Sequence, residues 1–118
     1  MTAYPHASFR IELAPGKKLG PGKVRLLELV AGTGSISAAA REMGMSYRRA
    51  WLLIEDSNTL FGAPLVESSA GGAGGGGARL TALGRQVIAA YRRIEREADA
   101  LVTRSLTRFP GLDVSKSR

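Results

Sequence analysis

The chain has 118 residues, 44% of them hydrophobic, which suffices for one modest core and predicts a single domain. Its net charge of +7 favours a polyanionic partner such as nucleic acid or an anionic membrane surface. The sequence has no cysteine, which excludes disulfides and thiolate metal sites. It also lacks a signal-peptide pattern and any apolar run near the roughly 20 residues of a membrane span. We therefore expect a cytoplasmic protein with no membrane partner.

The first predicted element is a short strand over residues 8–13, where apolar and polar side chains alternate. Its buried face would be Phe9, Ile11 and Leu13. The segment APGKKLGPGK that follows has the Pro and Gly content of a loop. A helix is then predicted from about Gly22 to Ala31, with Gly32 as its left-handed cap.

Two helices joined by a tight turn are predicted next. Ser35 is a good N-cap, and Gly44 would end the first of these helices after about nine residues. The apolar face of that helix would be Ile36, Ala39, Ala40 and Met43, spaced i, i+3, i+4 and i+7. Ser46 would cap the following helix. This spacing is typical of a helix-turn-helix over about residues 35–61, although any αα-corner can resemble it.

The second of these helices, predicted from Ser46 to about Phe61, divides into two faces. Its core face would be Ala50, Leu53, Ile54 and Ser57. Its first two turns carry Tyr47, Arg48, Arg49 and Trp51 off that face, as expected of a helix that enters a DNA groove. A solvated surface would explain the two arginines equally well. For Trp51 we expect packing in the core.

The segment GGAGGGG, residues 71–77, lies between two short predicted strands, residues 65–67 and 78–80. A linker is excluded because about 40 residues follow, too few for a second core. A phosphate-binding P-loop is excluded because no Gly-Lys-Ser/Thr tripeptide occurs. A wing over about residues 65–80 remains, in which glycines such as Gly75 and Gly76 bring main-chain N–H groups close to phosphates. Arg79 at its base would add charge.

A long helix is predicted over about residues 81–106, with Thr81 as its N-cap, followed by a polar tail over residues 107–118. One apolar stripe repeats every 3.5 residues along this helix, which is typical of a coiled-coil seam. The stripe consists of Val87, Tyr91, Ile94, Ala98 and Leu101. A single helix packed back on its own core is the alternative. We favour a homodimer seam, because a helix of about 38 Å is longer than this domain can cover.

Taken together, these segments resemble the DNA-binding half of the molybdate-responsive transcriptional regulators of the ModE type. The matching segments are residues 32–37 (GTGSIS), Ser46-Tyr47-Arg48, Ala50-Trp51, and residues 71–80 with Thr81 and Gly84. The resemblance covers about residues 8–106, and the helix-turn-helix alone is also similar to that of LysR-type regulators. It implies a mainly α fold with a small β wing, a winged helix-turn-helix with a long C-terminal dimerisation helix. Members of the family typically carry a C-terminal molybdate-binding region, which we do not expect residues 107–118 to form.

We therefore expect a bacterial, homodimeric transcriptional regulator that binds a pseudo-palindromic site on double-stranded DNA, with molybdate-related genes as its candidate targets. The expected DNA-binding residues are Ser35, Ser37, Ser46, Tyr47, Arg48, Arg49, Gly75, Gly76 and Arg79. Ser35 and Ser37 would hold a phosphate at a helix N-terminus. The alternative is a basic module that binds RNA or a protein through Tyr47 and Trp51.

The sequence gives no indication of catalysis. His6 is the only histidine and lies in a loose N-terminal segment, and no carboxylate pair or nucleophile–base set stands out. We expect no enzymatic activity, no metal and no cofactor. The residues after Leu106 are too few and too polar for a molybdate-binding barrel. A constitutive DNA binder, or one that takes its signal from a separate effector-binding protein, is therefore expected.

Overall fold

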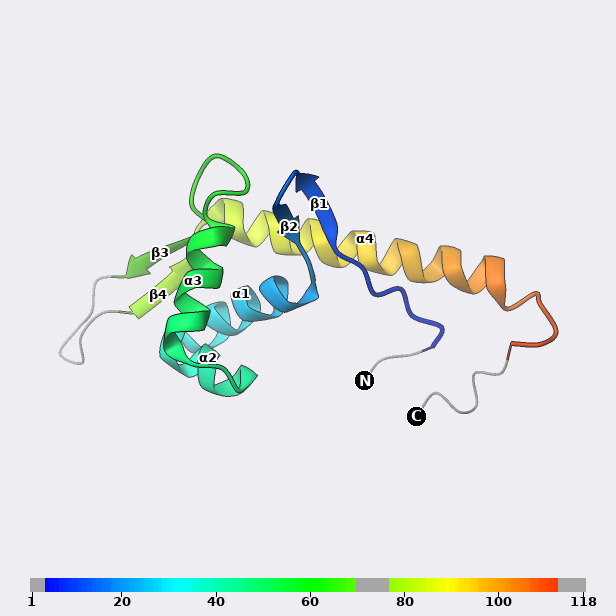
Figure 1. Cartoon of the computed structure of the whole chain (residues 1–118), viewed down its shortest axis with the longest axis horizontal. Coiled ribbons are helices and arrows are strands. Elements are labelled where there is room, and N and C mark those ends of the chain that lie inside the picture. Colours follow the sequence, from blue (N-terminus) through cyan, green and yellow to red (C-terminus); the bar gives the residue numbers. More distant parts are fainter. Residues whose placement is uncertain (1–3, 70–76, 113–118) are drawn as a thin grey trace.

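The computed structural model describes residues 4–69 and 77–112. The elements in chain order are β1 (Ile11–Ala14), β2 (Lys17–Leu19), α1 (Pro21–Thr33), α2 (Ile36–Met43), α3 (Tyr47–Ser57), β3 (Val66–Ser69), β4 (Gly77–Leu80) and α4 (Ala82–Leu106). The three short helices and the β3–β4 hairpin gather around one end of α4, and its other half runs beyond them (Figure 1). The predicted winged helix-turn-helix with a long C-terminal helix is therefore confirmed.

The three predicted N-caps are confirmed, and they explain where the helices begin. The hydroxyl of Ser35 accepts a hydrogen bond from the main-chain N–H of Ala38 at 3.1 Å, and that of Thr81 accepts one from Gly84 at 3.0 Å. Ser46 caps α3 in the same way, through the N–H of Arg49 at 3.1 Å. These bonds satisfy N–H groups that the first turn of a helix leaves unpaired.

Two helix ends differ from their predicted positions. Helix α1 continues past Gly32 to Thr33, and its left-handed cap is Gly34, with φ 71°. Helix α3 ends at Ser57 rather than near Phe61. The Asn58 side chain accepts hydrogen bonds from the N–H groups of Leu65 and Val66 and donates one to the carbonyl of Val66. Because Asn58 is bound to the start of β3, the chain leaves the helix there.

The N-terminal region is a β-hairpin rather than one strand and a loop. Strand β1 pairs antiparallel with β2, which places Ile11 opposite Leu19. The loop prediction was therefore wrong for residues 17–19. These residues form a strand of only three residues, and two of them are lysines, so the segment has no apolar alternation that would predict a strand. Leu13 was also wrongly expected to be buried, since it is 39% exposed.

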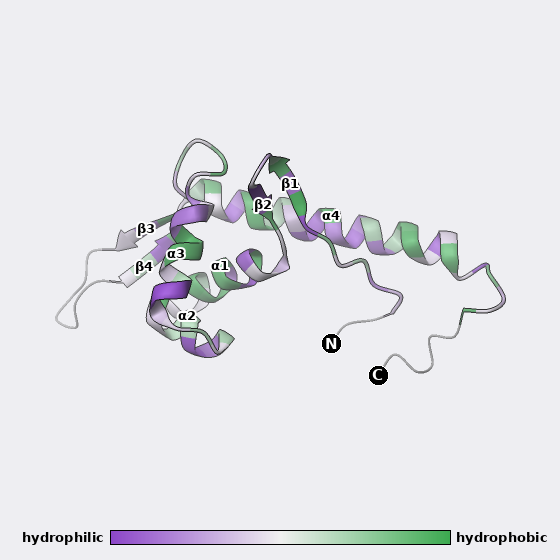
Figure 2. Cartoon of the chain, viewed as in Figure 1, coloured by the Kyte–Doolittle hydropathy of each residue, from purple (hydrophilic) through white to green (hydrophobic). Residues whose placement is uncertain are grey.

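The core is built mainly around α1. Val24, Leu27 and Val30 are fully buried against the other helices and the wing. Figure 2 shows hydrophobic residues on α1 and also along the free half of α4. At the base of the wing, a Cβ on Gly84 would lie 2.2 Å from the carbonyl oxygen of Leu65. Glycine at position 84 therefore lets α4 pack directly on the backbone before β3.

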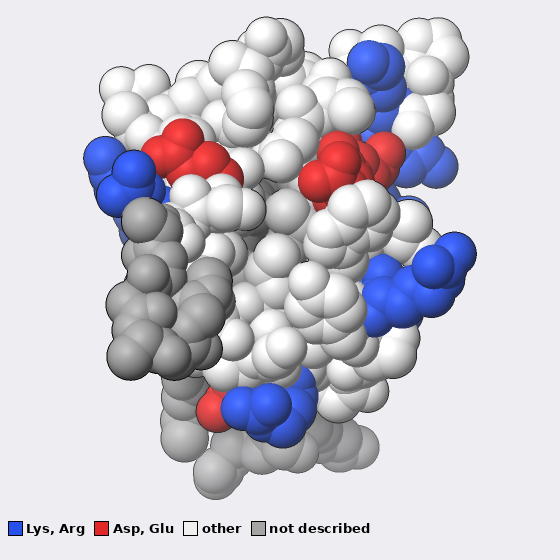
Figure 3. All heavy atoms as spheres, turned by 90° about the vertical axis from the view of Figure 1, so that its left-hand side faces the viewer, with Lys and Arg blue, Asp and Glu red and all other residues white. Residues whose placement is uncertain are grey.

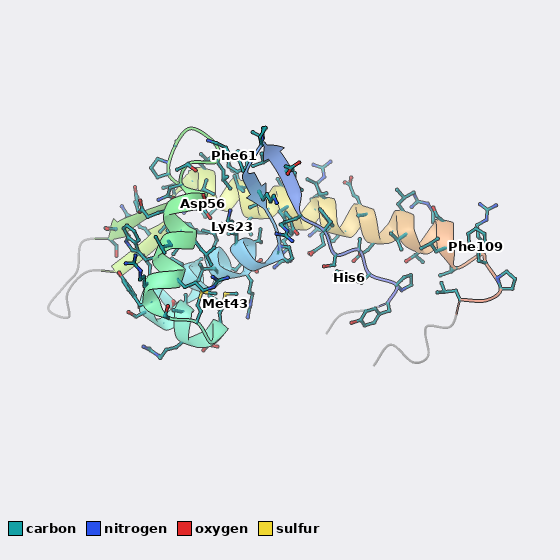
Figure 4. All side chains as sticks on the ribbon, viewed as in Figure 1. His6, Lys23, Met43, Asp56, Phe61 and Phe109 are labelled. Carbon is teal, nitrogen blue, oxygen red and sulfur yellow. The ribbon has the colours of Figure 1, made fainter. Side chains whose placement is uncertain are left out.

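Two sets of ion pairs hold the helices in place. Arg92 of α4 forms two hydrogen bonds with Glu28 of α1, at 2.7 and 2.9 Å, and one with Glu95 at 2.7 Å. The bonds from Arg92 hold the pKa of the Glu28 carboxyl below its usual value, although partial burial opposes that shift. Lys23 of α1 pairs with Asp56 of α3, and Figure 4 shows these two side chains facing each other.

Candidate nucleic-acid interface

Helix α3 presents its first two turns to solvent. Its core face, which includes Ala50, Ile54 and Ser57, is buried. Tyr47 is 53% exposed and Trp51 is 42% exposed. Arg48 and Arg49 are exposed, and among the described residues neither has a carboxylate within ion-pair distance. This face therefore offers aromatic surface and two unpaired cations.

The exposure of Trp51 corrects the expectation that it packs in the core. Ala50, its neighbour in sequence, takes the core position. Trp51 lies four residues after Tyr47, and residues at this spacing share a helix face. The sequence places both residues off the core face, and the expectation of burial rested only on the usual preference of tryptophan for the interior.

The start of α2 and the wing meet this part of α3 around one hollow of about 330 Å³. Its lining residues are Ser35, Ile36 and Ser37 at the start of α2, Tyr47 and Trp51 on α3, and Ser68, Gly77 and Ala78 in the wing. The N–H of Ala78 donates to the carbonyl of Gly34 at 3.0 Å, which fastens β4 to the turn before α2. The structure thus brings together three predicted DNA-binding residues, Ser35, Ser37 and Tyr47. Ser68 and Trp51 line the same hollow but were not among the predicted DNA-binding residues.

The remaining predicted residues of α3 lie around a second, neighbouring hollow of about 380 Å³. Ser46, Arg48 and Arg49 line it together with Leu52, Leu53 and Asp56. The outer surface of α3 therefore has two sides. One faces the wing and carries the aromatic residues, and the other carries the arginines.

The wing is an antiparallel hairpin in which Glu67 lies opposite Arg79. The two side chains form an ion pair, with Nε of Arg79 3.1 Å from Oε1 of Glu67. Arg79 is 67% exposed and Glu67 is 47% exposed at the side chain. Arg79 is thus paired with a carboxylate, and the sequence analysis did not predict this pair. The predicted contacts Gly75 and Gly76 lie outside the described residues.

The charges on this end of the molecule are distributed unevenly. Figure 3 shows Lys and Arg side chains around the margin of the face, Asp and Glu side chains in its upper part, and uncharged side chains across its middle. The residues that line the hollow between α2, α3 and the wing include no charged side chain. A polyanion on this face would therefore meet cations at its edges and hydroxyl, main-chain and aromatic groups at its centre.

The predicted dimer seam divides in two. Val87 and Tyr91 are 7% and 1% exposed within the single chain, so they are corrected from the seam to the chain's own core. The ring of Tyr91 stacks on Phe9 with centroids 5.4 Å apart, and its hydroxyl donates to the carbonyl of Phe9. Ile94 and Leu101 remain 45% and 55% exposed.

The exposed part of this stripe borders a shallow groove on the free half of α4. The groove, of about 490 Å³, is lined by Ile94, Glu97, Ala98, Ala100, Leu101 and Arg104. On another face of α4, Asp99 accepts hydrogen bonds from the N–H of Ala7 and from His6, which holds the N-terminal segment against the helix. The groove is thus left uncovered by the described chain.

Two features are absent from residues 4–69 and 77–112. No helix there is both long enough and apolar enough to cross a membrane. No three His, Asp or Glu side chains there stand close enough together to hold a metal ion.

Several characterised proteins are similar to this chain. MopB of Rhodobacter capsulatus, named a molybdenum-pterin-binding protein, is 50% identical over 80 residues, which are 68% of this chain and 30% of that protein. The molybdenum transport protein ModE of Azotobacter vinelandii is 39% identical over 98 residues, 83% of this chain and 36% of that protein. The DNA-binding transcriptional dual regulator ModE of Escherichia coli K12 is 45% identical over 71 residues, 60% of this chain and 27% of that protein. The chain thus spans about a third of the length of these relatives.

The match to a family covers the same elements that build the interface. Residues 22–85, from the start of α1 into the first turn of α4, match the family described as bacterial regulatory helix-turn-helix protein, lysR family. This segment contains the helix-turn-helix, the second hollow and the wing. The chain therefore belongs to the LysR family of bacterial regulatory helix-turn-helix proteins.

Proposed function

We propose that this chain binds duplex DNA with sequence selectivity, as a homodimer, and regulates transcription. The observation that carries the proposal is the convergence of α2, α3 and the wing on one exposed face, at whose side Arg48 and Arg49 have no ion-pair partner among the described residues. In this arrangement α3 enters the major groove and Arg48 reads a base edge. The start of α2, with Ser35 and Ser37, and the wing, with Arg79, contact phosphates on the flanking backbone.

We propose a second copy of the chain as the occupant of the α4 groove. Ile94 and Leu101 expose large apolar side chains there, and Leu106, Phe109 and Leu112 extend the exposed apolar surface beyond the end of the groove. Phe109 lies just past the end of α4 (Figure 4). Glu97 and Arg104 border the same groove. An antiparallel pairing of two copies therefore brings opposite charges together over an apolar strip.

We propose molybdate uptake or use as the process that is regulated. The support is that MopB and ModE, which are 50% and 39% identical to this chain over the aligned segments, are named for molybdenum-pterin binding and molybdenum transport. Cells that lack the gene should show altered transcript levels for molybdate transport or molybdoenzyme genes when molybdate is varied. Unchanged levels of all such transcripts would contradict this part of the proposal.

The test of DNA binding starts from a random duplex pool, from which the purified chain selects its preferred site. Affinity for that site and for random duplex is then measured by fluorescence anisotropy across a salt series. Several phosphate contacts predict a log–log slope of roughly −5 or steeper. Single-stranded DNA or RNA that competes better than duplex would instead support the alternative of an RNA-binding module.

Two arginine variants separate base reading from general charge. Arg48→Ala is expected to weaken the preferred site by about 5- to 150-fold more than random duplex, because a good base contact contributes about 1–3 kcal/mol of discrimination. Arg96→Ala removes an equal charge from an exposed position on α4 and serves as the matched control. Equal losses on both DNAs for Arg48→Ala would assign Arg48 to the phosphate backbone.

A further inference from the structure

Trp51 is a large aromatic side chain that the fold leaves partly exposed at the surface. It is the only tryptophan of the chain, it is 42% exposed, and it follows the 53% exposed Tyr47 by one helical turn. Side chains at this spacing lie next to each other on a helix. Tyr47 and Trp51 both line the hollow on the side of α3 that faces the wing.

The hollow beside these two side chains is lined by groups that suit the DNA backbone better than a base edge. Its lining residues offer hydroxyl groups from Ser35, Ser37 and Ser68, the first turn of α2, and the two aromatic side chains. It contains no Arg, Asn or Gln, the side chains that read base edges most often. It also contains no carboxylate that would repel a phosphate. Hydroxyl and N–H donors suit phosphate oxygens, and aromatic rings suit the C–H surface of a sugar.

We propose that Trp51, together with Tyr47, packs against a deoxyribose of the DNA strand whose phosphate contacts the start of α2. The inference rests on the proposed DNA-binding function. It assigns a different role to each side of α3. The aromatic side holds the backbone and fixes the position of the helix in the groove. The arginine side, with Arg48 and Arg49 around the second hollow, faces the bases.

Two expected results distinguish a sugar contact by Trp51 from a base contact and from neutralisation of a phosphate. Because every nucleotide carries the same sugar, Trp51→Ala should weaken the preferred site and random duplex by the same factor, at least about fivefold. Because an indole neutralises no phosphate, the log–log salt slope of Trp51→Ala should equal that of the unmodified chain. Trp51→Phe, which keeps an aromatic face, should recover a large part of the affinity.

The single tryptophan also allows a test without any substitution. The unmodified dimer is titrated with labelled duplex, and binding is followed by the anisotropy of the label. In the same samples the tryptophan emission is quenched with acrylamide. Saturating duplex should lower the acrylamide quenching constant at least about twofold, because the sugar covers the exposed part of the indole. Single-stranded DNA that does not bind serves as the control.

Phe61→Ala is the matched control for the variants. Phe61 is an aromatic residue with similar exposure, 39%, and lies in the loop after α3, away from the hollow (Figure 4). It should leave both affinities unchanged, and circular dichroism should show the same helix content for all variants. Normal duplex binding with an unchanged quenching constant would overturn the role of Trp51 and leave the proposed function standing. An absence of duplex binding in the anisotropy signal would overturn the function itself.

Discussion

Gly84 and Gly32 both lie within helices but have opposite surroundings. A Cβ at position 84 would meet the carbonyl of Leu65 at 2.2 Å, whereas a Cβ at position 32 would meet nothing within 4 Å. Gly84→Ala should therefore lower the free energy of unfolding by about 2–4 kcal/mol, because α4 must move away from backbone atoms that cannot yield. Thermal and urea unfolding followed by circular dichroism measure this change.

Gly32→Ala is the matched control and should stabilise the chain by up to about 1 kcal/mol, because alanine restricts the unfolded chain and favours the helix. A loss of stability at position 32 would show that α1 does not continue past it. Equal effects of alanine at positions 32 and 84 would contradict the close packing of α4 on the segment before β3.

The Glu28–Arg92 pair makes a pH-dependent contribution to stability. Its side chains are 27% and 29% exposed, and the pKa of Glu28 in the folded chain is lowered by the hydrogen bonds from Arg92. A carboxyl whose pKa is lowered by folding stabilises the folded state above its unfolded pKa, and this contribution is lost as the pH falls through its folded pKa. Glu28→Gln should therefore cost about 1–2 kcal/mol at pH 7.

The measurement compares the free energy of unfolding of Glu28→Gln with that of the unmodified chain at pH 7 and at successively lower pH. The difference should shrink once the pH falls below the ordinary pKa of a glutamic acid. Glu67→Gln alters the exposed pair with Arg79 in the wing and should cost well under 1 kcal/mol at any pH. A difference for Glu28→Gln that grows as the pH falls would refute the role of the pair.

At the scale of elements, the wing carries an ion pair that opposes its proposed role. Glu67 places a negative charge beside Arg79, and both side chains are largely exposed. Glu67→Gln should therefore raise the affinity for preferred and random duplex alike by a few-fold at low salt, because Arg79 is released and a charge that repels phosphate is removed. Anisotropy titrations at two salt concentrations test this.

Arg79→Ala is the counterpart and should weaken both duplexes by a similar factor and make the log–log salt slope less steep by about one. The double variant should bind like Arg79→Ala with a modest gain from the lost carboxylate. If Glu67→Gln weakened binding, the ion pair would instead be holding Arg79 in the position needed for DNA.

At the scale of the whole molecule, the exposed half of α4 is the proposed dimer interface. Ile94→Lys and Leu101→Lys place a charge in the apolar groove, where an unpaired charge is costly to bury. Both should convert the dimer to monomer by light scattering. They should reduce affinity for the preferred site far more than for random duplex, because a single half-site binds weakly.

Thr103→Lys is the matched control, since it adds the same charge at an exposed position of α4 that does not line the groove. It should remain dimeric. A monomeric unmodified chain, or a preferred DNA site without two-fold symmetry, would contradict a dimer through this groove.

Features that depend on neighbours in sequence could be predicted from the sequence alone. The caps at Ser35, Ser46 and Thr81 are bonds between residues three apart, so the starts of α2, α3 and α4 follow from residue type and spacing. The wing strands were likewise indicated by short apolar segments on both sides of the glycine run. The charge and the aromatic and basic residues of α3 indicated a nucleic-acid interface.

Features that depend on distant residues were decided by the tertiary structure. Helix α3 ends at Ser57 because the side chain of Asn58, the next residue, binds the start of β3. The apolar stripe of α4 is continuous in the sequence, but Phe9 and the core cover Tyr91 and leave Ile94 and Leu101 open. Hydrophobic periodicity identifies the face of a helix that must be buried. It carries no information on which partner buries each part of that face, because burial is a contact between segments far apart in the chain.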